Sequence, residues 1–472
     1  MLFRSRLADG APVQTIAPAA DGALEELVAL TIELDTFTLL GALGVARERQ
    51  GIADGLLLNT LAVLPFLAEG SLDGSAQALF SEPALLLQLG YAPVQLRDGV
   101  SRRHRQRAGK TAQSVPLHPD TLRDELARLT ATDWVRLQEE RLRVLYARRL
   151  IRSTKMVVDG SGLGDGERLV TLSALTGQGL VPLAWEFLTG DASEKGKEAV
   201  VTRALVERVR TIAGPTAITL LIADAFYADG PFLAWLQSTG TDALVRLPED
   251  RLLVGEALRV LAVEGTPWTT RRQTRVVDGR KETRTVELAA VGALTEWDSY
   301  QAKAAERGMA DPTLFVSFVH QVAPVVPPDK ALLALVSTRP WPDAWTTDEA
   351  YRPRWWIANA GFHELKEGWL LERYPWGRAE ETVRSRVGFT LLAQQVVALY
   401  RQAAGRQLAG YGIRRLRRAL RLRLGGAGRV RVVDDCYAVV TGEELLAALG
   451  RPVVESLLTP LPFRPARSPG LR

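Results

Sequence analysis

The sequence has very few of the residues that build disulfide frameworks or cysteine- and histidine-based metal centres. Its 472 residues include a single cysteine, Cys436, and four histidines. One cysteine cannot form an intramolecular disulfide or a cysteine-rich zinc module. Four scattered histidines argue against a histidine metal cage. The disulfide-framework and zinc-module classes of protein are therefore excluded.

Long hydrophobic runs are also missing. The longest one, around residues 56–67, is shorter than a bilayer requires and is interrupted by Asn59 and Thr60. Near the N-terminus, Arg4, Arg6 and Asp9 fall where a signal peptide would have its apolar stretch. We therefore expect no membrane partner and a cytoplasmic location.

The remaining composition is that of a folded protein with an uneven charge distribution. Apolar residues make up 47% of the chain and charged residues 24%, which excludes a disordered or fibrous chain. The 59 basic and 54 acidic residues give a net charge of +5, and all but eight of the basic residues are arginine. The length alone predicts roughly three domain-sized units.

Much of the basic excess lies in three stretches, at 97–110, 141–155 and 401–431. The first is typical of a loop, the second of a helix with a basic face, and the third contains an amphipathic helix around 414–424. Solvated helix faces are one explanation, and a membrane-surface helix at 414–424 is a weaker one. We favour a polyanion partner, because arginine binds phosphate bidentately and stays charged. The candidate DNA-binding residues are Arg102, Arg103, Arg105, Arg107, Arg148, Arg149, Arg414, Arg415, Arg417, Arg418 and Arg421.

The pattern along the chain predicts an α/β fold with helical N-terminal and C-terminal regions. Residues 1–150 are helical in pattern, and 151–248 alternate strands with helices. Residues 249–328 form a β-rich insertion, and 329–400 return to the core pattern with a long helix from about Thr347. Residues 401–472 form a basic C-terminal region that serves DNA binding or dimerisation. We therefore expect one mixed-sheet core in two parts, separated by the insertion.

Two aspartates follow apolar strands of the predicted core. Asp159 ends the run KMVVD before three small residues, and Asp224 ends ITLLIAD. Ligands approach α/β sheets at strand ends, and neighbouring glycines allow a close approach. An aspartate in such a place is more often a turn former, but two of them on adjacent strands can bind divalent cations through oxygen. Together with the basic stretches, they predict metal-dependent phosphoryl transfer on nucleic acid.

The order of these features resembles the bacterial insertion-sequence DDE transposases, which have an RNase H-like core. The family signature Tyr-x2-Arg-x3-Glu-x6-Lys lies on a helix after the insertion. This chain has Tyr351, Arg354, Trp355 and Ile357 in register, followed by a family-like run with Asn359, Gly361, Phe362, Glu364 and Leu365. The resemblance covers about residues 155–401.

The same register places Ala358 where the family has its third carboxylate. The signature lysine position holds Leu365, with Lys366 one residue later. Glu364 is a weak alternative carboxylate, because six residues of helix place it roughly 120° away from the face of position 358. Ala358 is either an engineered knockout, which we favour, or a natural loss in a domesticated copy.

The resemblance implies a cut-and-paste transposase that binds terminal inverted repeats of double-stranded DNA as a homodimer, in a bacterial cytoplasm and associated with the nucleoid. Asp159, Asp224 and a glutamate at 358 would hold two Mg²⁺ ions, with Mn²⁺ as a plausible substitute. Tyr351 and Arg354 match positions that contact phosphate. Trp268 and Trp297 are candidates to stack on a displaced base.

With Ala358, this copy is expected to bind DNA but to cleave it poorly. The alternatives are a catalytically inactive, transposase-derived DNA-binding protein and, more remotely, a hydrolase that does not act on nucleic acid.

Overall fold

The computed structural model describes most of the chain and divides it into two compact units. Unit 1 comprises Met1–Leu150 with His363–Arg472, and unit 2 comprises Ile151–Phe362. The described residues are 13–18, 22–45, 51–100, 116–164, 167–188, 197–248, 251–277, 280–310, 312–323, 331–354, 361–371, 376–404, 412–423, 428–432 and 436–440.

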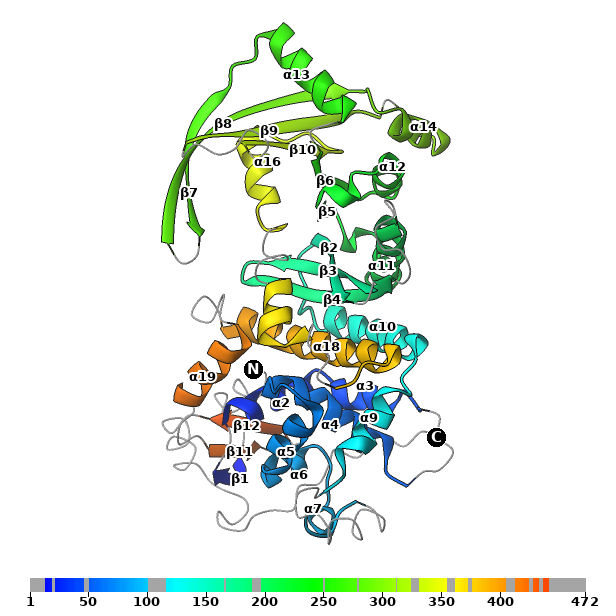
Figure 1. Ribbon diagram of the computed structural model, residues 1–472, viewed down its shortest axis with the longest axis vertical. Coiled ribbons are helices and arrows are strands. Elements are labelled where there is room, and N and C mark those ends of the chain that lie inside the picture. The colour runs from blue at the N-terminus through cyan, green and yellow to red at the C-terminus, as the bar shows by residue number, and fades with distance from the viewer. Residues whose placement is uncertain are drawn as a thin grey trace. The chain divides into compact units, whose positions relative to one another are not determined.

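Unit 2 is built on a nine-stranded mixed sheet with the strand order β4-β3-β2-β5-β6-β10-β9-β8-β7 (Figure 1). The predicted α/β class is therefore confirmed. The strands are β2 (Lys155–Gly164), β3 (Glu167–Thr176), β4 (Gly179–Leu188), β5 (Leu220–Ala223), β6 (Asp242–Leu247), β7 (Thr269–Val277), β8 (Arg280–Leu294), β9 (Leu314–Ala323) and β10 (Leu332–Ser337).

The first five strands combine an antiparallel meander with parallel strands. β2, β3 and β4 pair antiparallel, whereas β5 pairs parallel to β2, and β6 parallel to β5. Parallel neighbours require crossovers, which are supplied by α11 (Lys197–Ala213) and α12 (Gly230–Ser238). β5 has four buried residues in a row, as expected for a strand covered on both faces.

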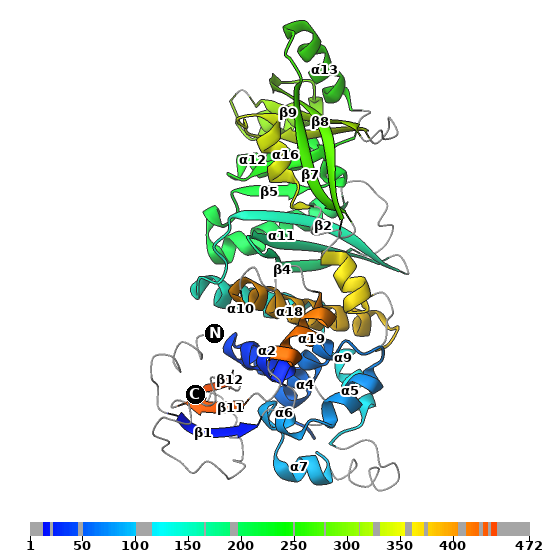
Figure 2. The ribbon, with the colours of Figure 1, turned by 90° about the vertical axis from the view of Figure 1, so that its left-hand side faces the viewer.

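The strands of the predicted insertion continue this same sheet. β10 pairs antiparallel with β6 on one side and with β9 on the other, and β8 and β7 follow outward from β9. The insertion also contains two helices that the pattern analysis did not assign, α13 (Leu252–Glu264) and α14 (Asp298–Glu306). Figure 2 shows the long β7–β8 hairpin edge-on beside α16 (Ala344–Tyr351).

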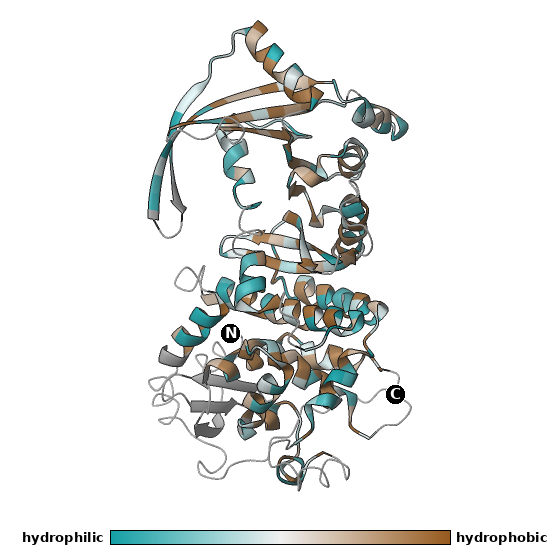
Figure 3. Ribbon diagram, in the orientation of Figure 1, coloured by the Kyte–Doolittle hydropathy of each residue, from teal (hydrophilic) through white to brown (hydrophobic). Residues whose placement is uncertain are grey.

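Unit 1 is mainly helical, as expected for its N-terminal part. Its helical elements are α2 (Gly22–Glu33), α3 (Thr36–Gly41), α4 (Asp54–Leu67), α5 (Leu72–Phe80), α6 (Pro83–Gln88), α7 (Pro93–Asp98), α9 (Pro119–Leu126), α10 (Ala131–Ala147), η4 (Glu364–Gly368), α18 (Glu380–Ala404) and α19 (Ile413–Arg423). α4 is apolar over nearly its whole length and is almost entirely buried (Figure 3). Within the described ranges, no single helix has the length and apolar composition of a membrane span, although α4 and α5, bent by 101° at their break, reach them together.

The unit boundary departs from the predicted division in one place. Residues 329–400 were expected to form one part of the core, but the chain leaves unit 2 after Phe362, and α18 belongs to unit 1. There α18 is buried along most of its length, and its Gln395 accepts a hydrogen bond from the buried Arg141 of α10 at 2.7 Å. A helix that is apolar on several faces must be enclosed by other elements. The N-terminal helices enclose α18.

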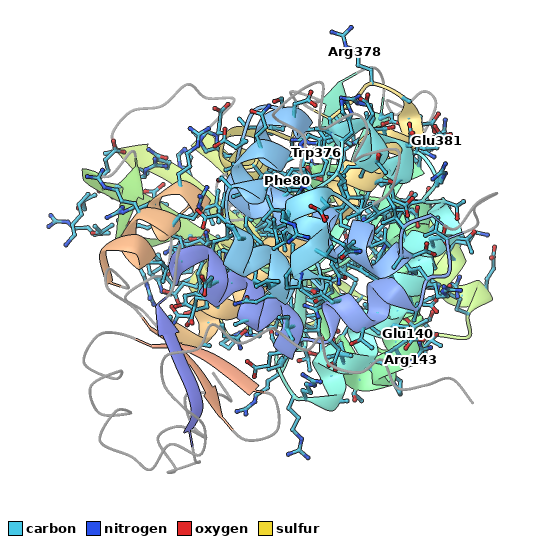
Figure 4. All side chains as sticks on the ribbon, turned by 90° about the horizontal axis from the view of Figure 1, so that it is seen from below. Phe80, Glu140, Arg143, Trp376, Arg378 and Glu381 are labelled. Atoms are coloured by element: carbon cyan, nitrogen blue, oxygen red, sulfur yellow. The ribbon has the colours of Figure 1, made fainter. Side chains whose placement is uncertain are left out.

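A small antiparallel sheet joins the two ends of unit 1. β1 (Val13–Pro18) pairs with β11 (Gly428–Val432), which in turn pairs with β12 (Cys436–Val440). β11 and β12 form a hairpin in the C-terminal region. On the outer side of α10, Glu140 and Arg143 lie side by side, and their Oε1 and Nη1 atoms are 2.7 Å apart (Figure 4).

A close approach at Gly388 fixes how α18 packs on α10. The indole of Trp134 stands edge-on to Phe389 with ring centroids 5.0 Å apart, and its Nε1 donates to Ser385 Oγ at 3.3 Å. A Cβ on Gly388 would lie 2.6 Å from the Trp134 ring. Only glycine leaves room for this indole.

We therefore expect Gly388→Ala to destabilise the protein. Overpacking of this kind costs about 1–3 kcal/mol, which outweighs a gain in helix propensity of about 1 kcal/mol. The measurement is the free energy of unfolding in urea. Gly55→Ala, in α4 with nothing within 4 Å of the added Cβ, is the matched control and should be neutral or stabilising. Equal effects of the two substitutions would contradict this account of the helix contact.

Candidate active site

The register of β2 and β5 brings Asp159 and Asp224 to the same edge of the unit 2 sheet. Lys155, Met156 and Val157 pair with Leu220, Leu221 and Ile222 in that order. Two residues further along each strand, this parallel register reaches Asp159 and Asp224. The two aspartates also influence each other electrostatically. The predicted meeting of these two residues is therefore present in the structure.

One detail of that prediction is wrong. Asp159 does not end its strand, because β2 continues to Gly164 and Asp159 pairs with Thr171 of β3. The edge exists because β5 ends at Ala223, so that beyond Val157 β2 is paired on the β3 side. The glycines that suggested a turn are accommodated inside the strand, with a bulge between Gly162 and Gly164.

Asp159 is a buried carboxylate with a strongly perturbed pKa. Its side chain is 8% exposed, and its Oδ1 accepts the Gly160 N–H at 2.9 Å. Burial raises the pKa of Asp159 to about 7, and the nearby charge of Asp224 adds to the increase. Arg354 and the Gly160 N–H oppose this rise in pKa, and Glu198 contributes to it. Asp159 therefore lies where negative charge is costly and a nearby cation would be stabilising.

Asp224 is held differently, at the start of a short helical turn. It caps η2 (Ala225–Tyr227), and its Oδ1 accepts the backbone N–H of Phe226 at 2.9 Å. This is the usual capping arrangement for an aspartate, so the turn-former interpretation and the site interpretation both apply to it. The cap fixes the carboxylate at the sheet edge.

Two residues of the signature, Tyr351 and Arg354, lie at this site. Arg354 Nη1 is 3.5 Å from Asp159 Oδ2, and its guanidinium is 5.7 Å from the centre of the Tyr351 ring. Tyr351 is buried, and burial raises the pKa of its hydroxyl, with the charges of Asp224 and Asp159 adding to the rise and Arg354 opposing it. The structure thus brings four sequence-predicted residues together.

α16 ends at Tyr351, and a two-residue turn of Arg352 and Pro353 separates it from Arg354, which is again helical. Proline has no N–H to continue the helical hydrogen bonds. Ala358, with Trp355, Ile357 and Asn359, lies outside the described residues.

An ion pair of Glu198 and Arg168, not predicted from the sequence, lies beside Asp159. Glu198, in the first turn of α11, is 4% exposed and pairs with Arg168. Arg168 Nη2 donates to the Gly160 carbonyl oxygen at 3.2 Å. Burial raises the pKa of Glu198, Arg168 and the Tyr227 hydroxyl lower it, and Asp224 raises it again. Glu198 is therefore a third acid within electrostatic reach of both aspartates.

This ion pair explains why residue 160 is glycine. A Cβ there would lie 2.7 Å from Arg168 Nε and from both carboxylate oxygens of Glu198. The space above Gly160 was expected to admit a ligand, but the protein's own side chains fill it. A sequence signal for Glu198 did exist, because it shares a helix face with Thr202, Leu205 and Val209.

Glu364 and Lys366 belong to unit 1, on the helical turn η4. Both carboxylate oxygens of Glu364 face Arg401, at 2.8 and 3.2 Å, and Oε1 also accepts the Ile413 N–H that begins α19 at 2.9 Å. Glu364 therefore fixes the contact of η4 with α18 and α19. The hydrogen bonds of Glu364 to Arg401 and Ile413 are sufficient to explain a glutamate at this position, so no catalytic role is needed.

The candidate DNA-binding arginines differ in their surroundings. Arg148 pairs with Asp35 and donates to the Glu33 carbonyl, and Arg149 closes α10 with a positive φ of 54°. On α19, Leu416 and Leu420 are buried, as the amphipathic pattern predicts, while Arg414, Arg415 and Arg418 are exposed and Arg417 donates to the Leu67 carbonyl. The residues Arg102, Arg103, Arg105 and Arg107, and the side chain of Arg421, lie outside the described part.

The two candidate stacking tryptophans are both packed. Trp297 is 8% exposed beneath the Arg251 guanidinium, and Trp268 contacts Phe318 and His320 with ring centroids 6.0 and 6.3 Å away. Neither is an exposed aromatic. The core interpretation holds for Trp297, and Trp268 is half-buried among rings.

A divalent cation fits the Asp159–Asp224 pair by its chemistry, because oxygen ligands and uncompensated buried negative charge both favour it. The described residues include no group of three or more histidine, cysteine, aspartate or glutamate side chains arranged to hold a metal ion. The site therefore offers two carboxylate ligands, and a two-ion centre would need a further carboxylate such as one at position 358.

Comparison with known proteins adds no further assignment. The sequence matches no protein-family model, and no curated protein matches it.

Asp159 should make the stability of the metal-free protein depend on pH. Because its folded-state pKa is raised to about 7, protonated Asp159 contributes stability below about pH 4 that is lost as the pH rises towards 7. Asp159→Asn removes this loss. The gap in unfolding free energy between the variant and the parent should widen by up to about 4 kcal/mol over that interval.

Urea unfolding of both proteins at several pH values, with a chelator present, measures this gap. Asp229→Asn, at the start of α12, is the control for a generic aspartate effect. Parallel pH profiles for the Asp159 variant and the parent would contradict the assignment of a perturbed carboxylate.

Proposed function

We propose that this chain is a DNA transposase of the insertion-sequence DDE type, whose members transfer DNA strands by metal-dependent phosphoryl chemistry. The single observation that carries the proposal is the group formed by Asp159, Asp224, Arg354 and Tyr351 at one sheet edge. Asp159 and Asp224 were predicted from their strands, and the sequence resemblance added Tyr351 and Arg354, more than a hundred positions after Asp224. A meander continued by parallel strands also agrees with an RNase H-like core.

In this proposal the residues divide the work of phosphoryl transfer. Asp159 and Asp224 would hold Mg²⁺ or Mn²⁺, which when bound stabilises charge on phosphoryl oxygens. Arg354 would bind a phosphate oxygen while keeping its contact with Asp159, because a guanidinium has donors on several sides. Tyr351 supports Arg354 through its ring. The Glu198–Arg168 pair keeps the backbone beside Asp159 in place.

The partner is double-stranded DNA, bound as terminal inverted repeats by a homodimer in the bacterial cytoplasm. Arg414 and Arg418 are exposed on α19, and in this proposal they are the residues that contact DNA phosphates. Arg148 and Arg149 are weaker candidates, since both contribute to the end of α10.

Ala358 makes this copy cleavage-deficient in the proposal, because a missing carboxylate weakens the metal site. We expect Ala358→Glu to gain Mg²⁺-dependent nicking of labelled transposon-end DNA, by a factor of about 100 or more, the scale of a lost catalytic group. Ala358→Gln is the matched control, which restores size without charge and should remain inactive. Ala358→Glu combined with Asp224→Asn should also be inactive.

A second candidate is an inactive, transposase-derived DNA-binding protein. It is favoured by Ala358 together with the absence, among the described residues, of a group of three metal-binding side chains. If Ala358→Glu binds DNA normally and cuts no strand with Mg²⁺ or Mn²⁺, this candidate replaces the first.

The α19 contact predicts a defined salt dependence. Each phosphate contact contributes about −0.9 to the slope of log K against log salt on duplex DNA. Changing Arg414 and Arg418 together to glutamine should therefore make the slope less steep by about 1.8. Fluorescence anisotropy between low and physiological salt measures it. Arg259→Gln, at an exposed arginine of α13 that is paired with Glu296 and lies outside the basic stretches, is the control and should leave the slope unchanged. An unchanged slope in the α19 variant would remove α19 from the DNA interface.

A further inference from the structure

An exposed aromatic ring stands beside the two aspartates. Phe226, two residues after Asp224, is 49% exposed. Large exposed hydrophobic side chains in the described part of the chain are few, and Phe226 is the aromatic one among them; the others are Val94, Val200, Leu252, Leu258, Val263 and Val322. Burial normally stabilises a phenylalanine side chain. A half-exposed one next to a candidate active site therefore calls for a binding role.

The ring of Phe226 is held in place from two directions. Its backbone N–H is bound to Asp224 Oδ1 at 2.9 Å, and the guanidinium of Arg168 lies over the ring, 5.3 Å from its centre. Arg168 is itself tied to Glu198 and to the carbonyl of Gly160. The side chain of Arg168 thus connects the Phe226 ring to Gly160, the residue that follows Asp159.

A preorganised ring costs less to use in binding than a mobile one. The ring of Phe226 therefore provides a flat apolar surface next to Asp159 and Asp224, two carboxylates that would bind a phosphate through a shared cation.

We propose that Phe226 is a stacking platform for an unpaired nucleobase of the DNA strand held at Asp159 and Asp224. This inference rests on the proposed function and names a ligand contact within it. A nucleobase fits better than a protein partner, because one ring at the edge of a polar site is far smaller than the roughly 800 Å² per partner of a stable protein interface. Stacking on an aromatic is sequence-tolerant, since every base has a π face.

This assignment moves the stacking role from Trp268 and Trp297 to a residue that the charge and aromatic pattern did not single out. Phe226 is 49% exposed, whereas Trp297 is 8% exposed and Trp268 is half-buried among rings. It also follows directly from the strand that carries Asp224, so the base it holds would be adjacent to the reacting phosphate.

The test uses the full chain and two DNA duplexes that share one strand containing a 2-aminopurine. In one duplex the complementary strand pairs with this base, and in the other it lacks the opposite nucleotide. We expect the parent protein to bind the duplex with the unpaired base about tenfold more tightly, the scale of stacking of one base. Phe226→Leu, which keeps apolar bulk without a π face, should abolish this preference and leave the affinity for the paired duplex unchanged.

The 2-aminopurine fluorescence provides a second readout, since stacking on an aromatic ring quenches it. Phe226→Tyr should retain both the preference and the quenching. Leu252→Ala, which removes an exposed apolar side chain from α13, should change neither. Because Phe226 is half-exposed, the urea unfolding midpoint of each variant is measured beside its DNA binding and is expected to stay close to that of the parent.

Two outcomes overturn the inference, and they are distinguishable. If the parent binds paired duplex but shows no preference that Phe226→Leu removes, the stacking assignment is wrong and the proposed function stands. If the parent binds neither duplex at low salt, both the stacking assignment and the proposed function are wrong.

Discussion

The organisation of unit 2 around its candidate site depends on how negative charge is accommodated below the surface. Asp159 is buried, Asp224 and Glu198 lie within electrostatic reach of it, and Arg354 and Arg168 supply the compensating charge. Burying an unpaired carboxylate is costly, so the arginines are required wherever the acids are retained. Arg354 arrives from the end of α16, Arg168 from β3 and Glu198 from α11. Elements distant in sequence are therefore constrained by one electrostatic balance.

The two pairs of acid and arginine at this site differ in their roles, one being structural and the other open to chemistry. Glu198 and Arg168 neutralise each other and fill the space over Gly160, which fixes the backbone next to Asp159. Asp159 and Arg354 are less closely matched, with Nη1 and Oδ2 separated by 3.5 Å. The more distant pair, Asp159 and Arg354, can therefore still bind an incoming cation or phosphate. The closer pair, Glu198 and Arg168, holds the neighbouring backbone in place.

Sequence patterns predicted the parts of this structure in which a residue's role follows from its local neighbourhood. The strands β3, β4 and β6 and the helices α11, α12 and α19 match their periodicities, and Asp159 and Asp224 meet because parallel strands in register carry their residues to one edge. The missed helix α13 had a usable signal in the buried Leu253, Val254, Ala257 and Leu261.

Other features depended on tertiary partners that no local pattern specifies. The membership of α18 in unit 1 follows from which helices cover it, and Arg148 was counted as surface charge although it pairs with Asp35. Composition gives the number of arginines, but it does not show which of them already form ion pairs or hydrogen bonds within the protein.

The continuity of the sheet also limits how this protein can be divided. β10 is hydrogen-bonded on both sides, to β6 and to β9, so residues 249–323 are not a detachable module even though they interrupt the core in sequence. Removing them would leave the apolar strand β10 with an open edge, which is a template for pairing with other chains. A shortened core would therefore be prone to aggregation through that edge.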